Sequence, residues 1–434
     1  MKIGLEVHVA LPTKSKLFCA CNNGESDLPN TNICPICMGF PGSKPMLNRA
    51  AVSSALGIAK ALKCSVAGTI SFVRKVYFYP DLPKSYQITQ MEGAIGHGGS
   101  LKIEGKSIRI RRIQIEEDPA QLIREGALTL IDFNRSGTPL VEIVTEPDIN
   151  SEEELRSFIA SLRSILYYLG VDINREIKAD LNISISEVRV EVKNVTGIKS
   201  LTEAARFEIM RQEELLKNKM EIARETRGYN EKSRSTESLR EKETDEEYGY
   251  IYEPDLTSFS TAGIQFKEAV FIGEVSKELA EGTGINPKTI SEMTLLDRNT
   301  LSIISRLRGR YSMRSIIHGI QRMKKYAPEE EDEAATERII RLVEEGKEVT
   351  KEMVQDAVAG REINVNYSAV GSEAMAAMVE KFLKENPEML SEYRRNRKTA
   401  NLIISRIAKE NRLNPKDVAK KVGEILDQYG HTSS

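Results

Sequence analysis

Apolar and polar residues alternate through much of the first half of the chain. Runs with this period of two, or with several β-branched residues in a row, lie at 3–9, 107–115, 128–133, 140–144, 181–185 and 188–192. Alternation places the apolar residues of a strand on one face, so each run predicts a β-strand with one buried side. The sequence therefore predicts strand-rich structure up to about residue 255.

Three helices are predicted between these strands. The clearest covers 151–169, where Ser151 and Glu154 form a capping box and Gly170 follows the last turn. Its apolar residues recur at the helical period of about 3.6 residues and form one stripe. Similar patterning predicts helices over 48–62 and from about 202 to 218.

The segment 227–247 has almost no apolar residues, and 12 of its 21 residues are charged. This composition predicts a solvated, mobile segment, with a plain surface loop as the alternative.

After about residue 256 the pattern becomes helical and remains so. Acidic residues at 329–333 follow Pro328, and they are expected to open a helix because its N-terminal dipole favours negative charge. Near the end, Asn414 and Pro415 form a typical helix start. We therefore predict an α+β protein with a mixed α/β domain over 1–256, an all-helical domain over 257–370 and a small helical tail domain over 371–434.

Composition and charge exclude some classes of protein. Lys and Arg number 62 against 64 Asp and Glu in 434 residues, so the formal net charge is -2. This balance excludes a globally basic nucleic-acid binder but allows a local basic patch. No apolar run approaches the roughly 20 residues that cross a bilayer, and the first residues enter a strand-like run without signal-peptide features. We expect a cytoplasmic protein without a membrane partner.

A local basic patch is present near the C-terminus. Residues 394–421 contain ten basic and two acidic residues, a net charge of +8 in 28 residues. Because each contact with a phosphate adds affinity through counterion release, the asymmetry favours RNA binding, with a solvated helix face as the alternative. The candidate contacts are Arg394, Arg395, Arg397, Lys398 and Arg406.

Four of the five cysteines are clustered. Cys19 and Cys21 form C-x-C, and Cys34 and Cys37 form C-x-x-C. Four thiolates can complete a tetrahedral zinc shell, so a structural zinc site is the favoured interpretation. A redox pair and unligated thiols are the alternatives. Cys64 stands apart and is expected to be a small buried hydrophobic residue.

Several carboxylates lie on or beside predicted strands. Glu6 and His8 are two residues apart and so share one strand face, as do Glu191 and Lys193. Acidic groups inside a concave sheet are costly unless they hold cations, and oxygen ligands suit Mg²⁺, which carries nucleotide phosphates. Taken singly, each carboxylate could equally be a surface residue or an ion-pair partner. The familiar phosphate-binding loops and the nucleophile elbow are absent from the sequence.

Longer strings carry a resemblance to a known family. IGLEVHV, KSKLFCAC, NTNICPICMGFPGSKPMLNRAAV and RKVYFYPDLPKSYQITQ strongly resemble the B subunit of the tRNA-dependent amidotransferases. The likeness continues through IEEDPA, LIDFNRSGTPLVEIVTEPDINS, ADLNIS, VEVKN, FEIMRQEELL, ETRGYNE and YEPDL, and it covers about 1–256. Enzymes of this family convert Glu-tRNA(Gln) to Gln-tRNA(Gln), or Asp-tRNA(Asn) to Asn-tRNA(Asn).

The resemblance implies a mechanism. The B subunit of the family has a cradle-shaped α/β domain that holds ATP and Mg²⁺ and phosphorylates the side-chain carboxylate of the misacylated amino acid. Ammonia, made from glutamine by the A subunit, an amidase-type glutaminase, then displaces the phosphate. A small C subunit belongs to the same complex. Phosphorylation supplies a leaving group, and catalysis rests on positioning and electrostatics.

The resemblance also assigns residues. Matched by motif, the catalytic residues would be Glu6, His8, Glu116, Glu117, Asp180, Glu191 and Lys193. Of these, the magnesium ligands would be Glu6, His8, Glu117 and Glu191. Contacts of the cradle with the tRNA acceptor end would come from Lys75, Tyr77, Tyr79, Lys84 and Tyr86, since tyrosines stack on bases and lysines contact phosphates.

Some positions depart from the family pattern. Gln114 stands where many members have a histidine, and Pro119, Ala120 and Gln121 replace an A-G-K string, so a lysine is missing. These changes keep open a tRNA-binding scaffold without kinase activity. A stand-alone zinc-ribbon RNA-binding protein and the archaeal paralogue specific for Glu-tRNA(Gln) also stay open. The paralogue has an inserted domain for which this length leaves no room. The sequence does not choose between the two tRNA substrates.

Overall fold

The computed structural model describes residues 1–24, 26–172, 177–241, 249–363, 372–395, 399–411, 413 and 415–430. The chain divides into two compact units, Met1–Arg298 and Asn299–Ser434. The predicted α+β class is confirmed, because the first unit combines a large sheet with helices and the described part of the second unit is helical. The division into three domains at 256 and 370 stays a prediction.

A nine-stranded sheet forms the centre of the first unit, with β1 in its middle. Neighbouring strands are antiparallel except for the parallel pair β12 and β13. In spatial order the strands are β14 (Ser235–Glu241), β13 (Glu225–Asn230), β12 (Val190–Thr196), β11 (Lys178–Ser184), β1 (Lys2–Ala10), β10 (Pro139–Thr145), β7 (Lys106–Glu117), β6 (Gly96–Ile103) and β2 (Ser65–Val66).

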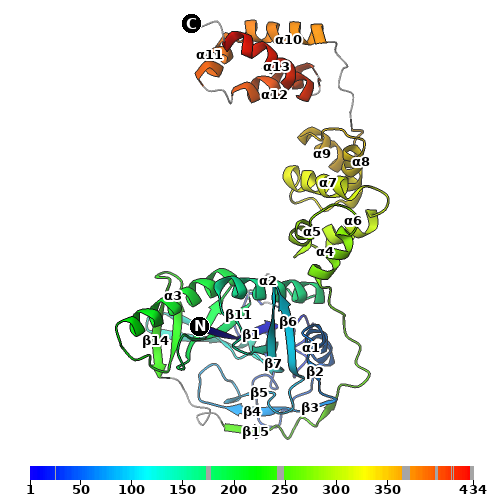
Figure 1. Ribbon diagram of the computed structural model, residues 1–434. Helices are drawn as coiled ribbons and strands as arrows, with labels where there is room; N and C mark the ends of the chain where they lie inside the picture. The colour runs from blue at the N-terminus through cyan, green and yellow to red at the C-terminus, as the bar shows by residue number, and fades with distance from the viewer. Residues whose placement is uncertain are drawn as a thin grey trace. The chain divides into compact units, whose positions relative to one another are not determined.

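Helices α2 (Glu152–Leu169) and α3 (Ile198–Lys217) cover one face of this sheet (Figure 1). Ile3, Leu5 and Val7 of β1 are buried in one core with apolar residues of α2 such as Phe158, and α1 (Arg49–Ala61) adds to that core. Because side chains alternate along a strand, Glu6 and His8 must lie on the other face of β1. The face away from α2 and α3 is therefore where polar side chains can gather.

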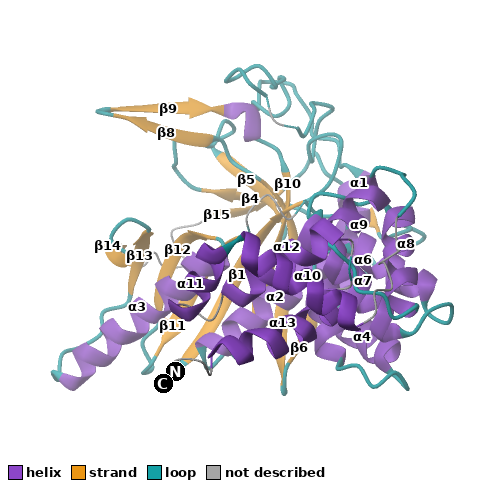
Figure 2. Ribbon diagram, turned by 90° about the horizontal axis from the view of Figure 1, so that it is seen from above, coloured by secondary structure: helices purple, strands orange, loops and turns teal. Residues whose placement is uncertain are grey.

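Smaller sheets complete the first unit. Strands β4 (Val73–Val76), β5 (Tyr86–Thr89) and β15 (Gly249–Tyr252) form a three-stranded sheet on the side of the large sheet away from α2 and α3 (Figure 1). Strands β3 (Thr69–Ile70) and β16 (Phe259–Ser260) make a short pair. The hairpin of β8 (Gln121–Glu125) and β9 (Leu128–Asp132) projects outward before the short 3₁₀ helix η1 (Phe133–Arg135) (Figure 2).

The predicted helix boundaries are largely confirmed. Ser151 accepts a hydrogen bond from the Glu154 amide at 3.1 Å, and Gly170 ends α2 with a φ of 101°. Helix α3 begins at Ile198, four residues earlier than expected. The acidic run at 329–333 was expected to open a helix. Only its last residue does so, because α8 (Glu333–Glu344) begins at Glu333 and is capped by Asp332.

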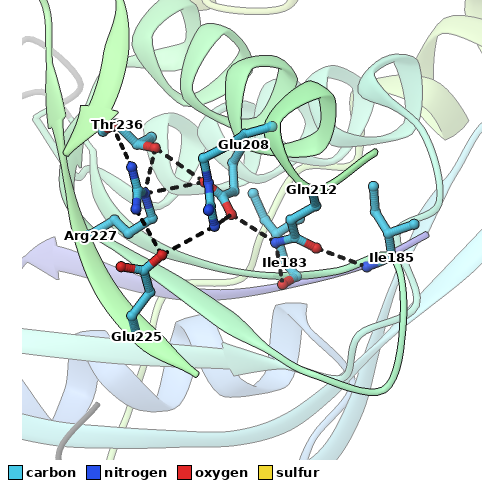
Figure 3. A network of polar contacts seen from close by, with 8 residues as sticks. Ile183, Ile185, Glu208, Gln212, Glu225, Arg227 and Thr236 are labelled. Carbon is cyan, nitrogen blue, oxygen red and sulfur yellow. Dashed lines mark hydrogen bonds and ion pairs between the residues drawn. The ribbon is translucent and has the colours of Figure 1, made fainter. Parts of the chain in front are cut away.

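The charged segment 227–247 is not the mobile segment that its composition predicted, at least up to residue 241. Strands β13 and β14 form a hairpin there, at the edge of the large sheet. Buried charge pairs hold it: Arg227 lies 2.7 Å from Glu225 and donates to Thr236 Oγ1 at 2.8 Å (Figure 3). Composition failed because Arg227 is neutralised by Glu208 and Glu225, which lie outside the segment, while most other charges of the hairpin are exposed on its strands and turn. Residues 242–248 lie outside the described part of the chain.

Two apolar clusters lie among the remaining described helices. Helices α4 (Ile272–Ala280) and α5 (Pro287–Thr294) belong to the first unit, and α6 (Arg298–Leu307) begins at the boundary. Helices α7 (Met313–Tyr326), α8 and α9 (Lys351–Val358) share one apolar cluster. A second cluster lies among α10 (Ser372–Glu385), α11 (Pro387–Arg395), α12 (Thr399–Asn411) and α13 (Pro415–Gly430). Within the described residues, no helix combines the length and apolar character that crossing a bilayer requires.

Candidate functional site

Acidic side chains from five adjacent strands gather on the face of the sheet away from α2 and α3. Glu6 lies opposite Asp180 of β11, and His8 lies opposite Glu142 of β10. Residues directly opposite in an antiparallel pair point to the same face, so these four side chains are neighbours. The same face receives Glu116 from β7 and Glu191 from β12.

A first group consists of His8, Glu116 and Glu142. His8 Nε2 lies 3.3 Å from Glu116 Oε1 and 3.6 Å from Glu142 Oε2, and both carboxylates are buried. Burial alone would lower the pKa of His8, but its hydrogen bond with Glu142 and the charge of Glu116 raise it to about 10. Burial and the charge of Glu142 raise the pKa of Glu116 to about 7. The two carboxylates therefore favour the protonated, positively charged form of the His8 imidazole.

Two neutral side chains fix this first group. Gln114 Nε2 donates to Glu142 Oε2 at 3.2 Å and to Thr89 Oγ1 at 3.3 Å, and Thr89 Oγ1 in turn donates to Glu116 Oε2 at 3.3 Å. Thr89 belongs to β5, so the smaller sheet contributes directly to the site. Gln114, a departure from the family pattern, thus has a defined structural partner.

A second group consists of Glu6, Asp180 and Glu191, whose carboxylates offer ligand atoms within 4.8 Å of one another. Asn182 donates to Glu6 at 3.1 Å, the Asn194 amide to Asp180 at 2.8 Å, and Thr226 to Glu191 at 3.2 Å. Burial raises the pKa of Glu6, and so do the nearby charges of Glu142 and Asp180. Burial also raises the pKa of Asp180.

The donor set of this acidic face fits a hard divalent cation. Like-charged carboxylates this close repel one another, and a bound cation removes that cost. Within the described part of the chain, three buried oxygens beside the groups receive no hydrogen bond: Gln114 Oε1, Glu142 Oε1 and Asn182 Oδ1. Carboxylate and amide oxygens suit Mg²⁺ better than a thiophilic metal.

Glu117 lies in neither group. Both of its carboxylate oxygens lie 2.5 Å from Lys84 Nζ, and one also accepts from the Ile88 amide at 2.9 Å. The predicted magnesium ligands are therefore brought together only in part, with Glu6 and Glu191 in one group, His8 in the other and Glu117 in an ion pair. Lys84 has 8% of its side chain exposed and holds this ion pair beside the small sheet. The roles assigned to both residues stay predictions.

Glu142 is a site residue that was not predicted from the sequence, whereas Lys193 was predicted. Lys193 shares a strand with Glu191, and its charge acts on the Asp180 carboxylate. The sequence does contain a signal for Glu142, since it is the one charged residue inside the otherwise apolar run LVEIV. A carboxylate buried in a central strand requires partners, and here they are His8, Gln114 and Arg112, whose guanidinium lies 3.7 Å from Glu142 Oε1.

The four clustered cysteines form a group that can hold a metal. The sulfurs of Cys19, Cys21, Cys34 and Cys37 all lie within 4.8 Å of one another. The Cys34 amide donates to Cys37 Sγ at 3.1 Å, and Gly39 turns the chain with a φ of 67°. The hydrogen bond from Cys19 lowers the pKa of Cys37 to about 5. Cys64 is buried apart from the cluster, as expected.

The cysteine loop is attached to both neighbouring parts of the fold. The Asn32 amide donates to Asn134 of η1 at 2.8 Å, and the Asn30 amide donates to Asp132 of β9 at 3.0 Å. Gly39 lies against Lys84 so closely that any Cβ there would collide with the lysine side chain. The loop therefore supports the Lys84–Glu117 pair.

The residues predicted to contact tRNA lie in three places: on and just after β4, on β5, and in the C-terminal helices. Lys75 of β4 lies over the Tyr77 ring at 5.7 Å, and its charge reaches Glu116 and Glu142. Tyr79 is half exposed, while Tyr86 stacks under Arg74 at 4.6 Å. In the tail, Arg406 is exposed on α12, and the side chains of Arg394 and Arg395 on α11 are not described. Arg397 and Lys398 lie outside the described residues.

Comparison with known proteins gives a consistent result. The family profile described as "GatB/GatE catalytic domain" matches residues 1–264. A relative from Methanoregula boonei, named as the B subunit of aspartyl/glutamyl-tRNA(Asn/Gln) amidotransferase, is 47% identical over 269 residues, which are 58% of this chain and 56% of the relative. A protein of the same name from Thermus thermophilus is 42% identical over 265 residues, with 58% and 56% covered.

A third protein of that name, from Sulfolobus acidocaldarius, is 43% identical over 325 residues, which cover 70% of this chain and 67% of the relative. The first two matches thus span little more than half the length of the relatives. The family profile includes every residue of the acidic face and all four clustered cysteines, since these lie within residues 1–264.

Proposed function

Since the chain belongs to the GatB/GatE catalytic-domain family, we propose that it is the B subunit of a tRNA-dependent amidotransferase. It uses ATP to phosphorylate the side-chain carboxylate of misacylated Glu-tRNA(Gln), Asp-tRNA(Asn) or both. Ammonia then attacks the acyl carbon, forms the amide and releases phosphate. The overall reaction is that of a carbon–nitrogen ligase with glutamine as the amido donor.

The observation that carries this proposal is the convergence of six titratable side chains on one sheet face: Glu6, His8, Glu116, Glu142, Asp180 and Glu191. Magnesium bound there would neutralise phosphate oxygens during transfer. The residues around it have a supporting task. Asn182 and Thr226 orient Glu6 and Glu191, while Gln114 and Thr89 orient Glu142 and Glu116.

The acceptor end of the tRNA is proposed to lie along β4 and the residues that follow it. Lys75 is close enough to Glu116 for its charge to act on that carboxylate, so a phosphate or carboxylate held by Lys75 would lie beside the acidic face. Phe78 and Tyr79 are exposed directly after this strand and suit base stacking. The basic segment 394–421 would contact the tRNA body.

The cysteine group is proposed to hold zinc in a structural role. Four sulfur ligands fill a tetrahedral shell and leave no open position for a substrate, so this metal takes no part in the reaction. Its task would be to fix the loop that carries Gly39 and lies against Lys84.

Partners follow from the proposed reaction. The chain offers no glutamine-hydrolysing nucleophile motif, so an amidase-type glutaminase, the A subunit, must supply ammonia. A small C subunit is expected in the same complex. We place this complex in the cytoplasm, where aminoacyl-tRNAs are used.

The purified chain with ammonium chloride and misacylated tRNA tests the proposal. Wild-type protein should hydrolyse ATP only in the presence of Glu-tRNA(Gln) or Asp-tRNA(Asn) and should not use glutamine without its partner. Glu6→Gln should lose this hydrolysis by at least about 100-fold while it retains tRNA binding, because the second group loses a charged ligand. Glu104→Gln, in the exposed turn between β6 and β7, is the matched control.

The result separates the alternatives. tRNA binding without tRNA-dependent ATP hydrolysis, even at high ammonium concentration, would identify a scaffold that lacks kinase activity. Comparison of the two misacylated tRNAs in the same assay decides the substrate.

A further inference from the structure

Among the described residues, Lys16 has one of the largest side chains that the fold buries completely. Its ammonium group donates to the Asn32 carbonyl at 2.8 Å and lies 3.8 Å from Cys37 Sγ. Within the described part of the chain, it forms no ion pair with a carboxylate. This lysine therefore differs from the buried cations elsewhere in the protein, such as Lys84, which pairs with Glu117.

A buried ammonium group without an opposite charge is strongly unfavourable. The carbonyl of Asn32 can accept one hydrogen bond, but it does not neutralise the charge. The sulfur of Cys37 is the other polar atom beside the ammonium group, and it belongs to the cluster of four cysteines. Four thiolates around a divalent ion carry a double negative charge, which is itself costly inside a protein. The lysine and such a centre would each remove the cost of burying the other.

The backbone fixes Lys16 where this pairing requires it. Its amide donates to the Cys21 carbonyl at 2.9 Å, and its carbonyl accepts from Asn48 at 3.2 Å. The aliphatic stem passes beside Gly137, where an added Cβ would lie 3.5 Å from Lys16 Cδ. The ammonium group is thus directed at the cluster by contacts from three different segments of the chain.

We propose that Lys16 is the built-in counter-charge of the cysteine metal centre, a positioning residue that offsets the negative charge of the four sulfur ligands and slows metal release. The inference rests on the zinc site of the proposed function and adds a role for a residue outside the ligand set. It is independent of the chemistry at the acidic face.

Three variants and one control test it in the full chain. Lys16→Met removes the charge and the hydrogen bond, Lys16→Gln removes the charge but can still donate, and Lys16→Arg keeps the charge. Lys14→Met changes an exposed lysine two residues away. For each protein, we would measure bound zinc, the rate of zinc transfer to a chromogenic chelator, and the thermal midpoint with zinc and after chelation.

Zinc release should be about 10- to 100-fold faster in Lys16→Met and Lys16→Gln, and close to wild type in Lys16→Arg and Lys14→Met. The order of the thermal midpoints should depend on zinc. Lys16→Met should melt at a lower temperature than wild type with zinc, and at the same or a higher temperature after chelation. A purely structural lysine would lower the midpoint in both states. If Lys16→Met does not fold, the release rates of Lys16→Gln and Lys16→Arg decide.

Two contrary results are distinguishable. Wild-type zinc binding with unchanged release from both uncharged variants would overturn the role of Lys16 and leave the zinc site standing. Wild-type protein that binds no zinc would overturn the zinc site and this inference together, without bearing on the acidic face.

Discussion

Several carboxylate side chains of this protein are buried, although carboxylates are more stable in water. Glu116, Glu142 and Glu191 are buried carboxylates, and each lies in a group with at least one further carboxylate. Stability alone would not select such an arrangement, because each charge raises the cost of burying the next. Costs of this kind are concentrated where proteins bind ions or perform chemistry.

Glu142 permits a direct test at this scale. Glu142→Gln removes the carboxylate that contacts both His8 and Gln114, so the first group loses charge while its volume is preserved. We expect tRNA-dependent ATP hydrolysis to fall by about 10- to 100-fold, with the far-ultraviolet spectrum unchanged. Glu146→Gln, just beyond the same strand and in a surface ion pair with Arg111, should retain full activity. Equal activity in both variants would remove Glu142 from the site.

At the scale of elements, the hairpin of β13 and β14 depends on a buried network more than on apolar packing. Glu208 of α3 is fully buried and accepts hydrogen bonds from Arg211, Gln212 and Thr236 (Figure 3). Gln212 also donates to the Ile183 carbonyl of β11 and accepts from the Ile185 amide. One helix is thereby joined to β11 and to both strands of the hairpin, beside the strand that carries Glu191.

Glu208→Gln should therefore destabilise the protein by about 3–5 kcal/mol, because Arg211 and Arg227 would share one remaining carboxylate, Glu225. Urea unfolding measures the loss, and amide exchange in β14 should accelerate. Glu152→Gln breaks a more exposed ion pair with Arg206 and should cost less than about 1 kcal/mol. A loss below that level in Glu208→Gln would show that apolar contacts hold the hairpin.

Elements with regular periodicity could be predicted from the sequence, and the residues that terminate them could too. Ser151 and Gly170 mark α2 because capping chemistry is local. Likewise, the strand at β1 follows from alternation, which also places Glu6 and His8 on one face. The hairpin at 225–241 could not be predicted, because Glu225 and Arg227 are neutralised by Arg211 and Glu208 of α3, which no local pattern reveals. For the same reason Glu142 and the pairing of Lys84 with Glu117 required the tertiary structure.

At the scale of the whole molecule, different parts of the chain have their own apolar cores. All residues of the largest apolar cluster, from Ile3 to Ile264, lie in the first unit. The helices from α10 to α13 enclose a separate cluster and carry most of the basic segment 394–421. Chemistry and electrostatic attraction of tRNA are therefore expected to be separable.

A protein shortened to residues 1–298 should unfold in one cooperative transition and bind tRNA more weakly than the full chain. The salt dependence of binding should also flatten, by about 0.7–0.9 in slope for each phosphate that the tail no longer neutralises. Fluorescence anisotropy between low and moderate salt provides the measurement. The full chain with Lys324→Gln and Lys325→Gln, two exposed lysines of α7, controls for general loss of charge. Unchanged affinity of the shortened protein would reject a tRNA-binding tail.

The position of β1 in the middle of the large sheet has a consequence for biosynthesis. Its two neighbours, β10 and β11, are encoded far downstream, so the newly made strand leaves the ribosome with both edges unpaired and its apolar face uncovered. Translation must pass residue 184 before both neighbours exist and residue 196 before Glu191 can join the face. A nascent chain that stalls earlier lacks the complete acidic face and presents an aggregation-prone strand to chaperones.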